Sequence, residues 1–442
     1  MSQLPYDVTS PLSIFNYSKG LSGKTLAEAI EMPIELLENV KNKGDLGSMI
    51  ERLYFKYEPN SNHGPDFTEA GIELKTTGVK KQSDGTFVAK ERLVLTMINY
   101  MGLVKEDWSD SSLMAKCRLM LILFYLYEKG TPVFDRRFVL NPILFSIPED
   151  DLVVIKRDWE MIQAKVKAGK AHELSEGDTY YLGACRKGSG GPNEKLREQP
   201  FPGPDAKSRA FSLKPNYMNL VISGHTTEAN ALNSEDVIKG GIEAATRKKF
   251  EPYLGKSVDE IADLQFFYKQ GKNDKGYYRN LTMRIIGGVK QAVPELEKGG
   301  IELKTIRVDK NWTPKESMSF PAFRYMDIVN EEWEDSSFFM KIEQKFLFVI
   351  YRYGEDGILR LENVKYWNMP YSDRREAQRV WQDTKRRVAL NARDLPGSTE
   401  SPVAHVRPKA KNAEDTLITP QGDMVSKKCF WLNKSYIAQQ LK

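Results

Sequence analysis

The spacing of apolar residues along the chain predicts alternating helices and strands. Helical spacing is found over residues 26–31, over 34–42 after the break at Pro33, over 46–57 and over 150–167. Period-two alternation, which is typical of strands, is found over 70–77 and 92–100. A long apolar run covers 113–127. Together these patterns predict an α/β or α+β architecture, in which a central mixed sheet is flanked by helices.

An internal repeat organises the chain. The hexapeptide Gly-Ile-Glu-Leu-Lys-Thr occurs at 71–76 and again at 300–305. Other landmarks recur in the same order, with a spacing between the copies that shortens gradually. The matching pairs are Lys43-Gly44 with Lys275-Gly276, Trp108 with Trp333, Trp159 with Trp381, Lys187 with Lys409, and Phe211 with Phe430. Two homologous copies that differ by small deletions explain this order. We therefore expect one domain over 1–225, a polar linker over 226–239 and a second domain over 240–442.

Composition is that of an ordinary globular protein. Of the 442 residues, 40% are hydrophobic and 28% are charged, and the sequence has neither eighteen consecutive apolar residues nor a signal peptide. We therefore expect a cytoplasmic protein. The three cysteines form no CxxC pair and the four histidines are scattered, so neither a zinc site nor a disulfide framework is expected.

The charge leaves nucleic acid binding open. The net charge is +5, from 65 basic and 60 acidic residues, which is only mildly basic. Between Arg374 and Lys411, however, ten lysines and arginines stand against four acidic residues. Such a segment could lie along phosphates, although a solvated helix face explains it equally well.

The residues that could carry chemistry lie in the first copy, where Asp66 stands seven residues before Glu73 in a Glu-x-Lys sequence. If Glu73 and Lys75 lie on one strand, both side chains point to the same face, with Ile72 and Leu74 buried on the other. Two carboxylates hold a hard divalent cation, which neutralises charge on a phosphate and lowers the pKa of a bound water, while a lysine orients or activates that water. Taken alone, the same pattern also occurs as surface charge on a strand.

Further landmarks, taken together, resemble the MutH family of GATC-specific endonucleases. In the first copy they are Lys43-Gly44, Glu51, Asp66, Glu73-Leu74-Lys75-Thr76, Trp108 with Lys116, and Arg157-Asp158-Trp159-Glu160. In the second copy they are 407–413 and 430–434. A single chain with two such domains is similar to the two-domain GATC restriction endonucleases of staphylococci and lactococci. The resemblance implies a PD-(D/E)xK restriction-endonuclease-like fold in two tandem MutH-like domains.

Residue by residue, the resemblance implies a magnesium-dependent nuclease site in the first copy. Asp66 and Glu73 would bind the metal ion, and Lys75 would serve the attacking water. Glu51, on the preceding helix, would support that water, and Lys43 would meet the scissile phosphate or its neighbours. Without the family, Glu51 and Lys43 are equally well explained as an exposed pair at a helix entrance.

Lys116 is the second lysine that the resemblance places at the scissile phosphate or its neighbours. It lies between the apolar residues Met114 and Leu119. An unpaired lysine in such surroundings would be costly, so a structural explanation is weaker here than for the other phosphate-contacting candidate.

The second copy lacks parts of this site. Glu302 and Lys304 remain, but Glu295 stands in place of the first copy's aspartate and Met283 in place of the helix glutamate. A methionine has no carboxylate with which to hold a metal-bound water. The longer glutamate side chain would displace its carboxylate, and octahedral magnesium tolerates such a displacement poorly. We therefore expect the second copy to have lost cleavage.

The segment that reads DNA shows the opposite trend. Arg407, Lys409 and Asn412 match the family's base-reading loop, and such cations can donate to guanine O6 and N7 in the major groove. In the first copy the corresponding candidates are Arg186 and Lys187, with Cys185 at the position of the second copy's arginine. The resemblance thus implies that the second copy still recognises DNA and acts as an allosteric effector domain.

These expectations combine into a type II restriction endonuclease that cuts double-stranded DNA at GATC with Mg²⁺. Its second domain would bind another site, with looping of the DNA, and a cognate DNA methyltransferase would be its functional partner. With one active domain per chain, either two chains meet on the DNA or two nicks follow in succession. Two alternatives stay open at this point, a mismatch-repair-type nicking enzyme and a sequence-specific DNA-binding protein without catalysis.

Overall fold

The computed structural model describes residues 4–31, 46–57, 64–188, 194–224, 231–268, 271–272, 274, 276–287 and 293–442. The chain divides into two compact units. The first unit consists of Met1–Leu174, Thr179–Ala229 and Lys298–Gly300, and the second of Ser175–Asp178, Asn230–Glu297 and Ile301–Lys442. The helix expected over 34–42, together with Lys43 and Lys275, lies outside the described residues.

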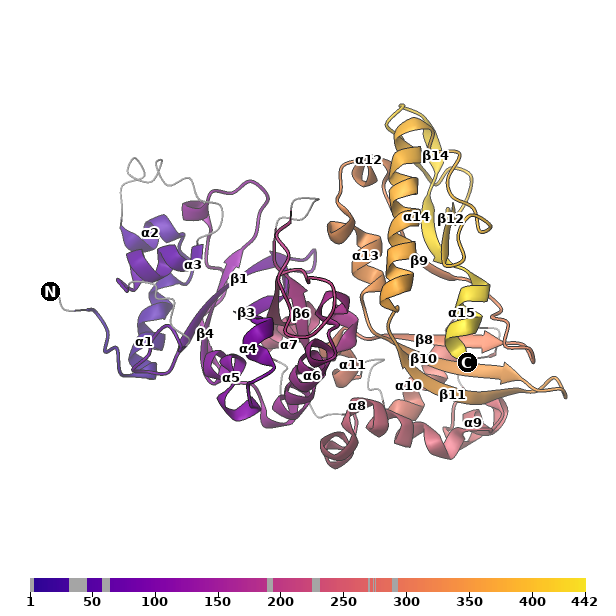
Figure 1. The fold of residues 1–442 in the computed structure, drawn as a ribbon, viewed down its shortest axis with the longest axis horizontal. Helices are drawn as coiled ribbons and strands as arrows, with labels where there is room; N and C mark the ends of the chain where they lie inside the picture. Colours follow the sequence, from indigo (N-terminus) through magenta and orange to yellow (C-terminus); the bar gives the residue numbers. More distant parts are fainter. Residues whose placement is uncertain are drawn as a thin grey trace. The chain divides into compact units, whose positions relative to one another are not determined.

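The first unit holds the first copy of the repeat (Figure 1). Within the described residues its α-helices are α1 (Pro11–Ser18), α2 (Leu26–Ile30), α3 (Leu46–Met49), α4 (Tyr100–Leu103), α5 (Ser112–Cys117), α6 (Glu149–Lys167) and α7 (Pro215–Ser223). Its strands are β1 (Glu73–Lys81), β2 (Phe87–Ala89), β3 (Leu93–Met97), β4 (Met120–Leu126), β5 (Ile143–Phe145), β6 (Leu182–Arg186) and β7 (Arg209–Leu213).

The strands of the first unit form two sheets. The mixed sheet has the order β2-β1-β4-β5, with β1 parallel to β4 and the outer pairs antiparallel. The other sheet, β3-β7-β6, is antiparallel. Strand β4 is buried at every position but its last. A strand that is covered on both faces needs apolar side chains at all positions, which explains the apolar run that the sequence shows there.

Several expected elements are found, with bounds that differ for local reasons. The helix expected over 150–167 is confirmed as α6, and 26–31 contains α2. Helical backbone over 46–57 is split into α3 and a π-helical turn, Ile50–Tyr54. The strand expected over 92–100 ends at Met97, because Asn99 caps α4 by accepting a hydrogen bond from Gly102.

The second unit holds the second copy. Within the described residues its α-helices are α8 (Ser234–Phe250), α9 (Val258–Leu264), α10 (Tyr277–Ile286), α11 (Pro294–Gly299), α12 (Tyr325–Ile328), α13 (Ser337–Ile342), α14 (Tyr371–Leu390) and α15 (Lys434–Leu441). Its strands are β8 (Glu302–Val308), β9 (Met318–Ala322), β10 (Phe346–Tyr353), β11 (Leu359–Trp367), β12 (Ala404–Pro408), β13 (Thr416–Ile418), β14 (Met424–Ser426) and β15 (Lys428–Leu432). The linker expected over 226–239 includes the start of α8, because Asn233 caps this helix by accepting from Asp236.

The second unit repeats the strand topology of the first. Parallel strands β8 and β10 correspond to β1 and β4, and β11 continues the sheet antiparallel in the order β11-β10-β8. The antiparallel sheet β12-β15-β9 corresponds to β6-β7-β3. In both units the expected mixed α/β architecture is confirmed, although the described strands are divided between two sheets in the first unit and three in the second, where β13 and β14 form a separate pair.

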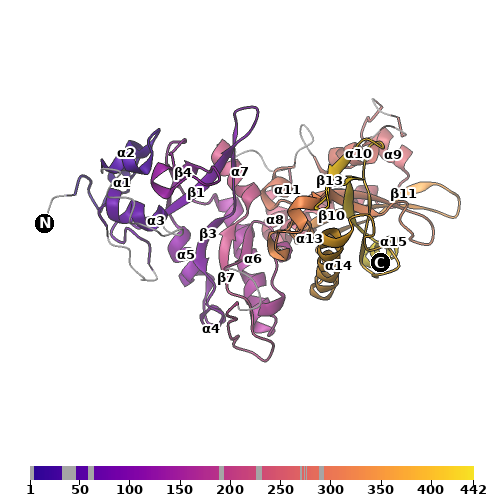
Figure 2. The same cartoon turned by 90° about the horizontal axis from the view of Figure 1, so that it is seen from above.

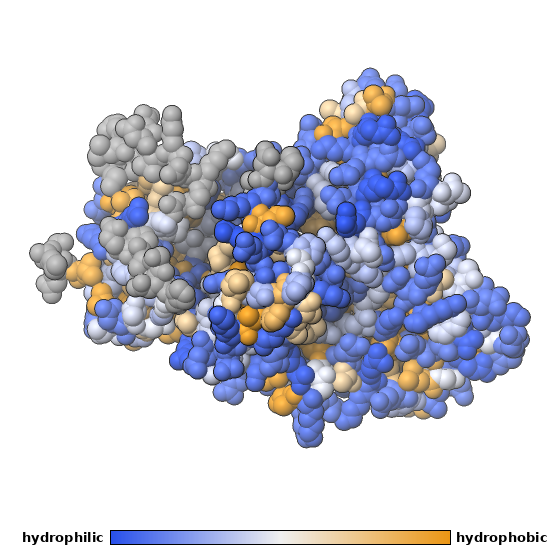
Figure 3. Space-filling view, in the orientation of Figure 1, coloured by the Kyte–Doolittle hydropathy of each residue, from blue (hydrophilic) through white to orange (hydrophobic). Residues whose placement is uncertain are grey.

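Helices pack against the two three-stranded sheets of the second unit. Helices α8, α9 and α10 pack against the sheet of β8, β10 and β11, and α14 packs along β12 (Figures 1 and 2). The visible surface of this unit is mostly hydrophilic, with hydrophobic surface at its upper end, near the end of α14 and β14 (Figure 3). Exposed large apolar side chains of α14, β13 and β14 are Leu390, Ile418 and Met424, respectively.

Among the described residues, no helix is both long and apolar enough to cross a membrane.

Candidate active site

A tight turn brings Asp66 beside strand β1. Phe67 and Ile72 form an isolated antiparallel bridge, and Gly71 between them adopts a positive φ of 67°, which glycine tolerates without strain. The turn folds the chain back, so that the Asp66 carboxylate accepts a hydrogen bond of 2.8 Å from the backbone N–H of Leu74. An aspartate that is seven residues away in sequence therefore lies at the start of the strand.

Strand β1 presents Glu73 and Lys75 side by side. The Lys75 Nζ lies 2.7 Å from a Glu73 carboxylate oxygen, as period-two alternation requires for side chains on one face. Ile72 and Leu74 are buried on the other side, at 0% and 5% exposure. Lys75 also donates a hydrogen bond of 3.0 Å to the backbone carbonyl of Leu95 on β3. The lysine is thereby fixed between the two sheets of the first unit.

Lys116 completes the cluster from the last turn of α5. Its Nζ lies 2.8 Å from the second carboxylate oxygen of Glu73 and 3.8 Å from Asp66 Oδ1. One ammonium group therefore lies within ion-pair distance of both carboxylates. The side chain is only 15% exposed, so these ion pairs remove the cost of burying an unpaired lysine.

Burial and charge oppose each other at Glu73. The residue is 3% exposed, and burial is the main cause that raises the pKa of its carboxyl above the usual value. The negative charge of Asp66 raises this pKa further, while Lys75 and Lys116 lower it. Such a balance is expected where two acidic groups share one small, water-poor site.

The donor set fits a hard divalent cation. Within the described residues, no group of three or more His, Cys, Asp or Glu gathers as in a closed metal cage. Two carboxylates nevertheless converge on the Lys116 ammonium, which shows that this place attracts positive charge. A cation held by two carboxylates, with water and phosphate oxygens as its remaining ligands, is the usual arrangement for Mg²⁺.

Glu51 and Lys43 are the remaining candidates of this site. Glu51 is half-buried in the π-helical turn that follows α3. Helix α3 packs against β1, and Gly47 of α3 lies close to the Thr76 hydroxyl. The turn that carries Glu51 thus follows a helix that packs against β1, whereas Lys43 lies outside the described residues.

The DNA-reading candidates of the first unit lie at the end of β6. Arg186, its last residue, forms a two-pronged ion pair with Glu194, and the backbone of Lys187 bonds to Ser208. Cys185 is buried at 1% exposure. The structure therefore does not bring Arg186 and Lys187 to the acidic cluster but places them at one end of the antiparallel sheet.

The corresponding place in the second unit lacks the paired carboxylates. Lys304 lies 2.6 Å from Glu302, and Lys341 of α13, which corresponds to Lys116, lies 3.8 Å from the same glutamate. The carboxylate of Glu295 instead accepts a hydrogen bond of 2.8 Å from the backbone of Leu232, and Met283 is buried in α10. The expected displacement of the Glu295 carboxylate is therefore found, because this carboxylate bonds to the segment that contains Leu232.

The recognition candidates of the second unit lie along and just after β12. Arg407 is exposed and stacks over the ring of Trp431 at 4.5 Å. The Nζ of Lys409 donates to the Phe320 carbonyl at 2.7 Å and to the Ser319 hydroxyl at 3.1 Å. Asn412 is exposed, and its side chain accepts a hydrogen bond from the backbone of Asp415. These three residues therefore share one stretch of surface.

Much of the basic charge between Arg374 and Lys411 is already paired. The ion pairs on α14 join Arg374 to Glu343, Arg379 to Glu376, Arg386 to Asp383, and Arg387 to Asp383 and Glu400. This helix is better described as a surface of internal ion pairs than as a row of cations directed at phosphates.

Two backbone carbonyls at the sites could not be found from the sequence. Strand β3 has a bulge between Val94 and Thr96, and the carbonyl of Leu95 at this bulge accepts from Lys75. Phe320 occupies the corresponding place in β9, and its carbonyl accepts from Lys409. Backbone groups carry no residue signature, whereas Lys341 could have been found by its equivalent spacing after Trp333 in the repeat.

Comparisons with known proteins agree with this geometry. The sequence profile of the family described as "DNA mismatch repair enzyme MutH" matches the chain twice, over residues 55–158 and 289–382. The chain is 31% identical to the "Type II restriction enzyme Sau3AI" of Staphylococcus aureus, over 97% of this chain and 98% of that protein. It is 29% identical to the "DNA mismatch repair protein MutH" of Shewanella sp. (strain MR-7), over 39% of this chain and 74% of that protein.

A third relative shows the same asymmetry. The "DNA mismatch repair protein MutH" of Yersinia enterocolitica is 27% identical over 50% of this chain, yet the match covers 96% of that protein. A mismatch repair relative thus matches half of the chain, whereas the restriction enzyme matches nearly all of it. The chain therefore belongs to the MutH-like type II restriction endonucleases, site-specific DNA endonucleases with the restriction-endonuclease-like fold in tandem copies.

Proposed function

We propose that this protein is a Mg²⁺-dependent restriction endonuclease that hydrolyses double-stranded DNA at GATC, with its first unit cutting and its second unit binding another site as an effector. The observation that carries the division of labour is the contrast between the two copies. Asp66, Glu73, Lys75 and Lys116 converge in the first unit, whereas in the second unit the carboxylate of Glu295 bonds elsewhere. The GATC sequence is what the family resemblance implies.

Each residue of the first unit would have a separate task. Asp66 and Glu73 would hold the metal ion, which supplies neutralisation of phosphate charge and a lower pKa for the attacking water. Lys75, fixed by Glu73 and the Leu95 carbonyl, would orient or activate that water. Lys116 would leave the carboxylates and contact the phosphate, and Glu51 would support the water from the turn after α3. Hydrolysis forms one P–O bond to water and breaks one P–O bond of the backbone.

Magnesium suits this site better than softer metals. Enzymes of this kind need a divalent metal ion, and the carboxylates present here supply oxygen ligands alone. The three cysteines are buried, and burial raises the pKa of the Cys117 thiol, which lies near Glu73 and Lys75, to about 12, so this thiol offers no thiolate ligand. An oxygen-only set favours a hard cation.

Recognition in the second unit would use Arg407, Lys409 and Asn412. Arg407 lies on β12, one edge strand of the antiparallel sheet β12-β15-β9, and Lys409, just after β12, contacts β9 on the other edge. Either cation can donate to guanine in the major groove. In the first unit, Arg186 and Lys187 would position the DNA that is cut.

Cutting both strands with one active unit requires two chains on the DNA or two successive nicks. A second GATC bound by the effector unit would loop the DNA between the sites. A cognate methyltransferase, acting as a functional partner, would protect the host sites. The mismatch-repair alternative is less well supported, because the relative that covers nearly the whole chain is a restriction enzyme.

The test uses matched substitutions in the two copies. We expect Asp66→Ala, Glu73→Ala and Lys75→Ala each to abolish cleavage of a GATC plasmid while DNA binding persists, because phosphate contacts outside the metal site supply most affinity. Glu302→Ala, at the equivalent position of the second unit, should still cut. Cleavage by any of the first three variants would remove its residue from the site, and loss of cleavage in Glu302→Ala would contradict the division of labour.

Specificity is tested separately. Methylated and unmethylated plasmids are digested with Mg²⁺, and the ends are sequenced. Ends at GATC would establish the sequence, whereas single-strand nicks alone would favour the mismatch-repair-type activity.

A further inference from the structure

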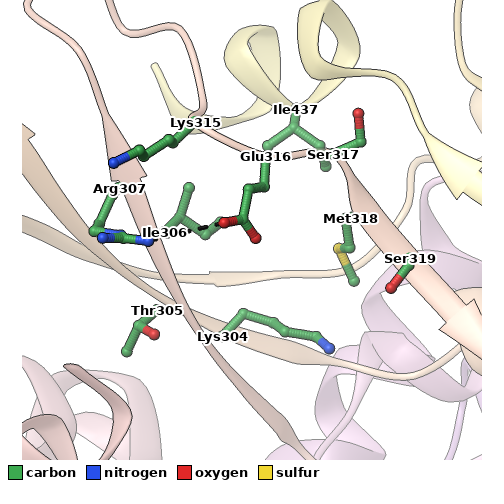
Figure 4. A pocket seen from close by; sticks show the side chains of 10 residues that line it. All are labelled: Lys304, Thr305, Ile306, Arg307, Lys315, Glu316, Ser317, Met318, Ser319 and Ile437. Atoms are coloured by element: carbon green, nitrogen blue, oxygen red, sulfur yellow. Dashed lines mark ion pairs between the residues drawn. The ribbon is translucent and has the colours of Figure 1, made fainter. Parts of the chain in front are cut away.

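The second unit has a cavity of about 230 Å³ beside strand β8 (Figure 4). Three of its lining side chains are cations, Lys304, Arg307 and Lys315, and one is an acid, Glu316. Lys304 and Glu316 reach toward the cavity from opposite sides in Figure 4, and Arg307 lies 3.8 Å from the Glu316 carboxylate. Because Glu316 is 80% exposed, this carboxylate can move into solvent without leaving a buried charge behind.

The cavity occupies the place that corresponds to the first unit's acidic site. Lys304 corresponds to Lys75, but Arg307 stands where β1 has Gly78, and β8 is an edge strand whereas β1 is paired on both sides. The first unit's carboxylates draw in a cation, whereas the second unit presents three cations around an opening. At the matching strand position of the second unit, Lys304 is paired with Glu302, and the other two cations lie beside this pair around the opening.

The cavity is continuous with the recognition candidates. Ser319, which lines it, accepts a hydrogen bond from Lys409, so a fourth cationic group lies at its margin. Ser319 is also paired in the sheet with Trp431, the residue on which Arg407 stacks. A duplex read by Arg407 and Lys409 would therefore pass close to this opening.

We propose that this cavity binds a backbone phosphate of the duplex that the second unit recognises. The proposal rests on the proposed effector function and names its phosphate contact. A phosphodiester has one negative charge and oxygen acceptors, which suit Arg307 and Lys315, and it would displace Glu316 from Arg307. Lys304, the counterpart of the catalytic lysine, would thus bind phosphate without cleaving it.

The experiment measures binding of the full chain to a labelled duplex without GATC, by fluorescence anisotropy over a range of salt and without divalent metal. Each lost phosphate contact lowers the slope of log affinity against log salt by about 1. We expect Arg307→Gln combined with Lys315→Gln to lower the slope by about 1, because both cations bind the same phosphate. Glu316→Gln should act in the opposite direction and raise affinity at low salt, because it removes the only acid of the lining.

Lys310→Gln is the matched control. Lys310 lies on the same β8–β9 connection and pairs with Glu355, but it does not line the cavity. It should leave the slope within error. A double variant that melts at the wild-type temperature and keeps the wild-type slope would overturn the proposal, and so would a loss restricted to duplexes that contain GATC, since that is base reading.

A second arm separates this proposal from the effector function. Cleavage of a labelled one-site duplex is followed while an uncleavable GATC duplex is added. We expect the double variant to need about tenfold more of the added duplex for half-maximal stimulation, from the loss of this phosphate contact. If the wild type shows no stimulation but the double variant has the lower salt slope, the effector function fails and the phosphate site stands.

Discussion

Lys116 carries the charge that joins Asp66 and Glu73 in the first unit. Without the Lys116 ammonium between them, the carboxylates of Asp66 and Glu73 would repel each other. Burial, which already raises the pKa of Glu73, would then favour the protonated form of this residue. The ammonium group therefore holds the acids in place, and it does so where the proposed divalent cation would bind. Lys116 and the metal ion would compete for one location.

This competition predicts that Lys116→Met tightens metal binding in the absence of DNA. Methionine keeps the length of the side chain but removes its charge, so Ca²⁺ should bind about tenfold more tightly, which is ~1.4 kcal/mol. The measurement is calorimetric titration of the free protein with Ca²⁺. Lys341→Met, at the equivalent helix position of the second unit, is the control. Equal or weaker Ca²⁺ binding by Lys116→Met would show that the lysine does not occupy the metal's place.

Glu51 allows a second prediction at the residue scale. Because its proposed task is to support the attacking water, Glu51→Gln should slow cleavage and leave Ca²⁺ affinity within about twofold, since an outer-shell group is not itself a ligand. Single-turnover cleavage and calorimetric titration give the two values. A rate equal to that of the wild type would make Glu51 an ordinary surface residue of its turn.

At the scale of elements, one buried carboxylate fixes α6 to β6. Asp158 is fully buried, and it accepts three backbone hydrogen bonds of 2.6–2.9 Å, from Tyr180, Tyr181 and Leu182. Tyr180 to Leu182 lead into β6, whose other end carries the reading candidates Arg186 and Lys187. Helix α6, which the sequence predicts over 150–167, thus fixes the start of β6, the strand at whose other end these candidates lie.

We expect Asp158→Asn to lower the free energy of unfolding of the first unit by about 1.5–3 kcal/mol, the value of hydrogen bonds to a charged group. The asparagine NH₂ would face a backbone N–H, so at least one donor would lose its partner. Urea unfolding followed by tryptophan fluorescence gives the value, with Glu160→Gln on the exposed face of α6 as the control. A difference below 0.5 kcal/mol between the variants, roughly the range of surface substitutions, would contradict this account.

The paired bulges show how the same element serves two purposes. In β3 the bulge turns the Leu95 carbonyl toward Lys75, and in β9 the Phe320 carbonyl meets Lys409. A bulge releases a carbonyl from the ladder and makes it available to a side chain. A strand irregularity found in both copies therefore holds Lys75, the proposed catalytic lysine, in one copy and Lys409, the proposed recognition lysine, in the other.

At the scale of the whole molecule, the two copies should respond differently to the loss of their reading lysines. Lys409→Ala removes a base contact of ~1–3 kcal/mol, so a plasmid with two GATC sites should lose its rate advantage over a plasmid with one. Lys187→Ala should instead slow the cleavage of both plasmids, because that lysine would position the DNA being cut. Initial rates at fixed salt give both ratios.

The result for Lys409→Ala decides whether this residue has an effector task. An unaltered two-site preference in Lys409→Ala would remove the effector task from that residue, and the small salt-sensitive loss of an exposed cation would be all that remains. Allosteric coupling requires two separate sites whose occupancy affects one another, and of these two plasmids the two-site plasmid reports it.

The sequence by itself determined the features that depend on local periodicity and on repetition. Alternation along β1 places Glu73 and Lys75 on one face, and the uninterrupted apolar side chains of β4 indicate a strand covered on both sides. Order and spacing of the repeated landmarks indicate two copies, which the family profile matches separately. The strand properties follow from the geometry of neighbouring residues, and the repeat follows from the order of residues along the chain. Both can therefore be predicted without knowledge of the fold.

Only the tertiary structure decided which distant groups meet. Lys116 reaches Glu73 because α5 ends where β4 begins beside β1, and the Glu295 carboxylate bonds to Leu232 because α11 replaces the turn that holds Asp66. The Leu95 and Phe320 carbonyls enter the sites through strand pairing alone. Contacts between residues far apart in sequence depend on packing and register, and no local pattern of side chains encodes them.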